Sequence, residues 1–183
     1  MSSYFINKFN FKFKAKCRKI VGAFKHSDNL CRKLKEAQIH LHHPAVKFCQ
    51  DVPTRWLSTF YMLDSILVNK ESIREMQLRE PDLCFVKNIL EDSEYKSIND
   101  YCTLLQSVVD ATVYLSGRKY VTSSSLIPIF FTLINYKVKD LDISCLHIKS
   151  LQVDLVSNLR ARMNYIFQSD SYLISTFLTY PFR

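Results

Sequence analysis

The chain has 183 residues, of which 48% are hydrophobic and 13% aromatic, so it can bury a core and is not a disordered tail. Its two glycines, Gly22 and Gly117, exclude a Walker loop and a dinucleotide-binding fingerprint, because each of these motifs needs closely spaced glycines. No apolar run approaches the roughly 18 to 20 residues that span a bilayer, so the sequence predicts no membrane partner.

The positive charge is concentrated in the first part of the chain. The formal net charge is +8; residues 1–50 carry eleven Lys and Arg against two acidic residues, and the remainder carries 14 against 15. A basic segment beside a near-neutral remainder is typical of a protein that binds a polyanion, because neutralised phosphates release counterions. The alternative interpretation is a solvated basic helix that only adds solubility.

Residues 1–16 predict an N-terminal arm or a residual strand. Phe9, Phe11 and Phe13 alternate there with polar residues, which is the period of a strand. Lysines interrupt the segment and no continuous apolar stretch follows, so it is not a secretory signal and an intracellular protein is expected. In a reducing compartment the six cysteines are expected to be free and mostly buried.

The first half of the chain then predicts three helices. Apolar residues at spacings of three and four indicate two helices between residues 14 and 41, with Ser27 as the N-cap of the second. The proline-containing segment 42–54 has no period and predicts a connector. A single amphipathic helix is expected over 59–80, capped by Ser58.

The second half predicts three more helices. The first covers 98–115, and Gly117 follows it where a left-handed C-cap is expected. The second starts at the serines 123–125, and its nearly continuous apolar run over 126–134 predicts the most deeply buried helix. The third covers 151–166. The predicted fold class is therefore mainly α, with at most a short N-terminal strand.

A histidine cluster near the first helices raises the question of a metal site. His40, His42 and His43 lie close in sequence to Cys31 and Cys49, which suggests zinc. Structural zinc sites, however, favour Cys-x2-4-Cys or His-x3-5-His pairs, and neither spacing is present. A polar loop is the favoured interpretation, and no metal or other cofactor is expected.

The chain's single tryptophan, Trp56, directly follows Arg55. Tryptophan offers a flat face on which an unpaired base can stack, and a neighbouring arginine can hold the adjoining phosphate. In the alternative interpretation Trp56 is a core anchor and Arg55 forms an ion pair with Asp51.

Three groups of residues resemble hAT superfamily transposases, in particular the BED-type zinc-finger proteins derived from them. The resemblance extends from about Lys14 to Tyr180. Two departures are the Leu57 that replaces the asparagine usual after tryptophan, and a tail that lacks the aspartate of the family phrase. The matching groups are Arg18 to Gly22 with Phe24 to Ser27, Leu34 and Gln38; Gln50 to Trp56 with Ser58, Thr59, Met62 and Leu63; and Ala111, Thr112 and Leu115 to Gly117 with Tyr120, Thr122, Ile127 and Pro128.

This resemblance implies that residues 17–183 are the helical insertion of an incomplete RNase H-like domain. It also implies that Trp56 matches the tryptophan that supports flipped or hairpin DNA in the family. The family's chemistry uses two metals held by two aspartates and a glutamate. None of these carboxylates is recognisable here, and the BED finger and the C-terminal dimerisation segment are expected to be absent, so no enzyme activity is expected.

The sequence thus predicts a catalytically inactive, transposase-derived nuclear chain that binds DNA weakly and without sequence preference, and takes no small-molecule substrate. The alternatives are a helical interaction module that binds itself or a related transposase, and a non-functional gene fragment. The expected DNA-binding residues are Lys14, Lys16, Arg18, Lys19, Lys25, Arg32, Lys33, Lys35, Arg55 and Trp56.

Overall fold

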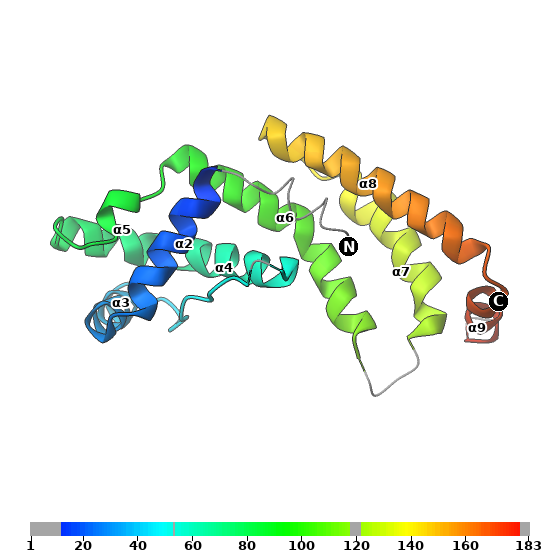
Figure 1. Cartoon of the computed structure of the whole chain (residues 1–183), viewed down its shortest axis with the longest axis horizontal. Helices are drawn as coiled ribbons and strands as arrows, with labels where there is room; N and C mark the ends of the chain where they lie inside the picture. Colours follow the sequence, from blue (N-terminus) through cyan, green and yellow to red (C-terminus); the bar gives the residue numbers. More distant parts are fainter. Residues whose placement is uncertain (1–11, 53, 118–121, 180–183) are drawn as a thin grey trace. The chain divides into compact units, whose positions relative to one another are not determined.

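The computed structural model describes residues 12–52, 54–117 and 122–179, and the chain divides into two compact units, residues 1–102 and 103–183 (Figure 1). Every regular element in these described ranges is helical, which confirms the mainly α prediction. No helix within them is long and apolar enough to cross a membrane.

The first helix begins earlier than predicted. Helix α2 covers Lys12–Lys25, so the last five residues of the predicted arm are helical, and residues 1–11 lie outside the described residues. Phe13, Cys17, Ile20 and Phe24 are all buried at spacings of four and three, which is the helical period. Phe13 therefore lies on the buried face of a helix. The two-residue period that predicted an arm or strand was wrong for residues 12–16.

The break between the first two helices was predicted correctly. Helix α3 covers Asp28–His40, and the Oγ of its N-cap Ser27 accepts a hydrogen bond from the Leu30 amide at 3.3 Å. Such a cap satisfies one of the amides that a helix start leaves unpaired. The two helices pack against each other, and α3 also packs against α5.

The predicted helix over 59–80 is instead two helices. Helix α4 covers Trp56–Val68 and α5 covers Lys70–Arg79, with the buried Asn69 between them. Ser58 lies inside α4 rather than at its cap. Its Oγ donates to the Arg55 carbonyl at 2.6 Å and ties the start of α4 to the preceding turn.

The first unit is completed by a short 3-10 helix and the start of a long α-helix. The 3-10 helix η1 covers Val86–Asn88 and contacts α2, and α6 covers Asp92–Leu115, longer than predicted. Its first turn is stabilised by Glu94, whose Oε2 accepts from the Glu91 amide at 2.9 Å. The unit's largest fully buried side chains are Ile20, Met62, Leu63, Ile66, Ile73, Phe85, Ile98 and Tyr101.

The second unit contains the rest of α6 and the last helices of the chain. They are the 3-10 helix η2 Ser123–Ser125, α7 Leu126–Thr132, the π-helix η3 Leu133–Val138, α8 Leu146–Phe167 and α9 Asp170–Thr179. Helix α8 confirms the prediction over 151–166, whereas α9 was not predicted.

Three predictions were wrong. The run over 126–134 is not the most deeply buried helix: α7 has no buried residue and Phe131 is 47% exposed, and only Leu133 and Ile134, where η3 begins, are buried. An apolar run becomes buried only where other elements cover it on all sides. Gly117 has no positive φ angle and is not a left-handed cap. All six cysteines are free, but only Cys17 and Cys102 are buried.

Candidate nucleic-acid interface

Arg18 forms the most buried ion pair of the basic segment. Its Nε donates to Oδ2 of Asp51 at 2.9 Å and its second guanidinium nitrogen donates to the same oxygen at 2.7 Å. The Asp51 side chain is only 2% exposed, and hydrogen bonding to it raises the pKa of Arg18. Asp51 therefore pairs with Arg18, not with Arg55 as the alternative interpretation held.

Three further predicted DNA-binding lysines are also engaged within the first unit. Lys16 Nζ lies 2.8 Å from Oε2 of Glu94, and Lys33 is paired with Glu80. Lys14 is buried, and this burial lowers the pKa of its ammonium group. These cations are not presented to solvent as unpaired charges, so they contribute less to a phosphate-binding surface than their number in the sequence suggests.

Four of the accessible cations of the first unit line one groove. The groove has a volume of about 780 Å³ and lies between the end of α2, helix α3 and residues 45–50 of the connector. Asp28 is the one acidic residue among those that line it. Its four cations are Lys25, Arg32, Lys35 and Lys47.

These four side chains differ little in their freedom to bind an anion. Lys25, Lys35 and Lys47 are exposed, and no carboxylate in the described ranges lies within ion-pair distance of them. Arg32 donates to Oδ1 of Asn29 at 3.1 Å and lies 3.9 Å from Glu36, both on the same exposed helix surface, and such surface contacts are weak. The groove therefore gathers four positive charges, of which only Arg32 has a carboxylate within ion-pair distance in the described ranges.

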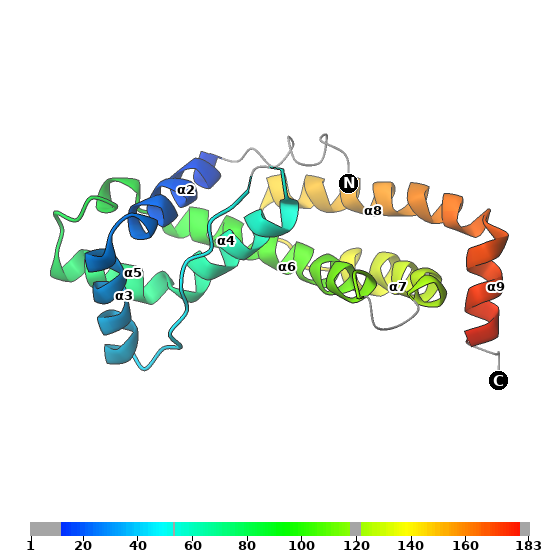
Figure 2. The same ribbon diagram turned by 60° about the horizontal axis from the view of Figure 1, so that its bottom comes forward.

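The connector wall of the groove is fixed by a buried network of amide side chains. The Val46 carbonyl accepts from Nε2 of Gln38 at 2.8 Å and from Nδ2 of Asn69 at 3.2 Å. Gln38 Nε2 also donates to Oδ1 of Asn69 at 2.6 Å, and the Cys49 amide donates to Oγ of Ser65 at 3.2 Å. Figure 2 shows this connector running from the end of α3 to the start of α4.

The histidine cluster lies at the C-terminal end of α3. His42 has a φ of 54°, its amide donates to the Ile39 carbonyl at 3.1 Å, and the His43 amide donates to the Gln38 carbonyl at 2.8 Å. This is a Schellman motif, with histidine at the left-handed position that glycine usually occupies. His40 Nδ1 lies 2.8 Å from Glu75. The described part of the chain gathers no three His, Cys, Asp or Glu side chains that could hold a metal.

Arg55 and Trp56 do not line the groove. Arg55 is the exposed N-cap residue of α4, and Trp56 is the half-buried first residue of that helix. Lys19 is exposed on α2 and is likewise not among the groove-lining residues. The structure thus brings together part of the predicted set, and it adds Lys47, which the aperiodic connector sequence did not single out.

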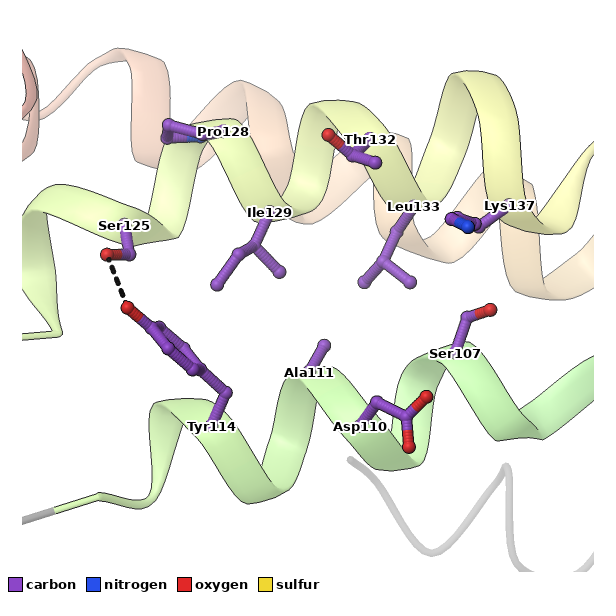
Figure 3. A pocket seen from close by; sticks show the side chains of 10 residues that line it. All are labelled: Ser107, Asp110, Ala111, Tyr114, Ser125, Pro128, Ile129, Thr132, Leu133 and Lys137. Atoms are coloured by element: carbon purple, nitrogen blue, oxygen red, sulfur yellow. Dashed lines mark hydrogen bonds between the residues drawn. The ribbon is translucent and has the colours of Figure 1, made fainter. Parts of the chain in front are cut away.

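The second unit has a separate, mostly apolar pocket of about 490 Å³ (Figure 3). It lies between α6 and the consecutive helices η2, α7 and η3, and at one end the hydroxyl groups of Tyr114 and Ser125 are 3.3 Å apart. Asp110 and Lys137 also line it, alongside Ile129 and Leu133. Its charged side chains are of opposite sign, so it lacks the one-sided charge of the basic groove.

Comparisons with known proteins agree with the helical fold. The family model of the ZBED1 RNase-like helical domain matches residues 12–104, which include every groove residue. The chain is also 25% identical over 161 residues to "Zinc finger BED domain-containing protein 4" of Homo sapiens. This alignment covers 88% of the chain and 13% of that relative, and no solved structure matches.

The fold and these matches define a helical chain of the BED-type, hAT transposase-like class. Within this class, the chain belongs to the ZBED1 RNase-like helical domain family. The matched range ends two residues beyond the first unit, so the family assignment rests on the unit that contains the basic groove.

Proposed function

We propose that the chain binds DNA without sequence preference, through phosphate contacts in the basic groove. The observation that carries this proposal is the gathering of Lys25, Arg32, Lys35 and Lys47 around one groove with a single acidic residue. Phosphate contacts supply most of the affinity of sequence-independent DNA binding, and side chains without intramolecular partners are the ones free to make them. DNA binding of this kind would place the chain in the nucleus.

The proposal does not include strand cleavage. Two-metal phosphodiester chemistry needs carboxylates that converge on the metal ions and are free to ligate them. Asp51, the carboxylate of the motif that contains Arg55 and Trp56, is buried and held by Arg18. It is therefore assigned a structural role.

A salt series tests the proposed DNA binding. With four phosphate contacts, a plot of log affinity against log salt has a slope of about −3.6, so affinity for a short duplex falls roughly 10²-fold between about 50 and 200 mM salt. Replacing Lys25, Lys35 and Lys47 with glutamine is expected to reduce the magnitude of this slope by about 2.7. Fluorescence anisotropy of a labelled duplex measures the affinity at each salt concentration and so gives the slope.

The matched control removes three exposed lysines that do not line the groove, Lys96, Lys139 and Lys149, also by substitution with glutamine. It lowers the net charge equally and is expected to change the slope by less than the groove variant does. An equal change in both variants would show that DNA responds to the overall charge, and the groove would have no special role.

We propose self-association through α9 as a second function of the chain. Helix α9 has no buried residue, and Ile174 and Leu178 on one side of it are 58% and 73% exposed. Clustered exposed apolar side chains typically mark an interaction surface. The proposed occupant is a second copy of the chain, which would bury the same stripe on each partner.

Sedimentation without DNA tests this second proposal. The mass of the unaltered chain is expected to rise with concentration, and replacing Ile174 and Leu178 with aspartate is expected to abolish the rise. The control, Asn164→Asp together with Thr179→Asp, adds the same two charges at exposed positions outside this stripe, one on α8 and one on another side of α9. A monomer at every concentration would contradict the proposal.

A further inference from the structure

We infer that the basic groove prefers single-stranded to duplex DNA, because Phe48 provides a platform on which an unpaired base can stack. This inference rests on the proposed DNA binding at the same groove. Phe48 is half-buried and lines the groove next to Lys47. Base stacking on aromatic side chains within a basic groove is the general way in which proteins bind single strands.

The Phe48 ring is supported from within the first unit. Its centroid lies 4.7 Å from that of Phe24, with the two ring planes at 53°. Phe24 is 2% exposed, and its own ring lies 5.1 Å from that of Phe85, which is fully buried. The hydrophobic core therefore supports the ring of Phe48, which is half-buried and lines the groove.

The backbone on both sides of Phe48 is also fixed. The Val46 carbonyl accepts from Gln38 and Asn69, and the Cys49 amide donates to Ser65. A ring held in place before the ligand arrives loses little conformational freedom on binding, which favours affinity. Phe48 is thus a preorganised part of the connector wall.

The charges around Phe48 suit a nucleic-acid backbone. Lys47 precedes the ring along the connector, Lys25 follows Phe24 at the end of α2, and Lys35 lies on α3. The groove volume of about 780 Å³ lies within the roughly 300 to 1,000 Å³ typical of ligand sites. In a duplex the bases are stacked on one another, so only an unpaired base can use the aromatic surface.

The test compares one DNA sequence as a single strand and as a duplex at the same salt concentration. The unaltered chain is expected to bind the single strand more tightly. Phe48→Leu, which keeps an apolar side chain against Phe24, is expected to weaken single-strand binding by about tenfold and to leave duplex binding unchanged. Phe48→Tyr keeps the flat ring and is expected to retain the preference.

Each outcome separates this inference from the proposed function. Duplex binding as tight as single-strand binding, or equal losses for both DNAs in Phe48→Leu, would overturn the inference while leaving salt-dependent binding intact. Binding of neither DNA would overturn both. A melting curve reports whether Phe48→Leu is folded. If it is not, the inference is tested by comparing the binding of the two DNAs to the unaltered chain and to Phe48→Tyr.

Discussion

Replacing Arg18 with alanine is expected to lower the free energy of unfolding of the first unit by about 3 kcal/mol. The substitution leaves the Asp51 carboxylate, whose side chain is 2% exposed, without the guanidinium that it accepts hydrogen bonds from. Removing one partner of a buried pair typically costs about 3 to 5 kcal/mol. The lower end applies here because the Arg18 side chain itself is 38% exposed.

Urea unfolding followed by circular dichroism measures this loss. Arg32→Ala is the control, because the Arg32 side chain is 72% exposed and its contact with Glu36 is 3.9 Å, so an effect of at most about 0.5 kcal/mol is expected. The double replacement Arg18→Met with Asp51→Leu should cost less than Arg18→Ala, since it leaves no buried charge. Similar losses for Arg18→Ala and Arg32→Ala would contradict a stabilising role of the pair.

The second large effect is expected at Phe85, where alanine should cost about 3 to 5 kcal/mol of unfolding free energy. The side chain is fully buried, and its ring packs against Phe24, which in turn supports Phe48. Alanine leaves a cavity beneath this aromatic stack, because a packed core relaxes only partially around a lost side chain.

Chemical denaturation of Phe85→Ala measures the cost, with two comparisons. Phe85→Leu keeps most of the volume and is expected to cost less than about 1.5 kcal/mol. Leu78→Ala changes a side chain that is 83% exposed and is expected to alter stability by at most about 0.5 kcal/mol. A Phe85→Ala loss no larger than that of Leu78→Ala would show that Phe85 is not part of the core.

Local signals in the sequence predicted some helix boundaries and missed others. Ser27 was recognised as an N-cap because serine before an apolar-periodic run has a direct physical role there. The break at Asn69 was missed because its cause is tertiary. Asn69 bonds with Gln38 and with the Val46 carbonyl, residues distant in sequence, and no glycine or proline marks the position.

Burial was harder to predict than helicity. The run over 126–134 is nearly all apolar, yet only its last two residues, Leu133 and Ile134, are buried, because burial depends on which elements cover a helix. The sequence also did not predict that α7 continues as the π-helix η3. Periodicity therefore identified α8 but could not rank the helices by depth.

The candidate site was predicted only in its charge. The sequence located the basic segment, but it could not show that Arg18 forms an ion pair with Asp51, 33 residues further along the chain, or that Lys16 forms one with Glu94. Lys47 and Phe48 were missed, since they lie in a connector without periodicity. Their place in the groove follows from the amide network that folds the connector back along α3.

Hydrogen exchange with and without DNA tests the central claim, that the groove binds DNA, most directly. A hairpin with a single-stranded overhang offers both forms of DNA at once. We predict slower exchange on adding it in residues 28–40 and 45–50, and unchanged exchange in α9. Protection confined to residues 54–63, or no protection in either groove segment, would contradict the claim.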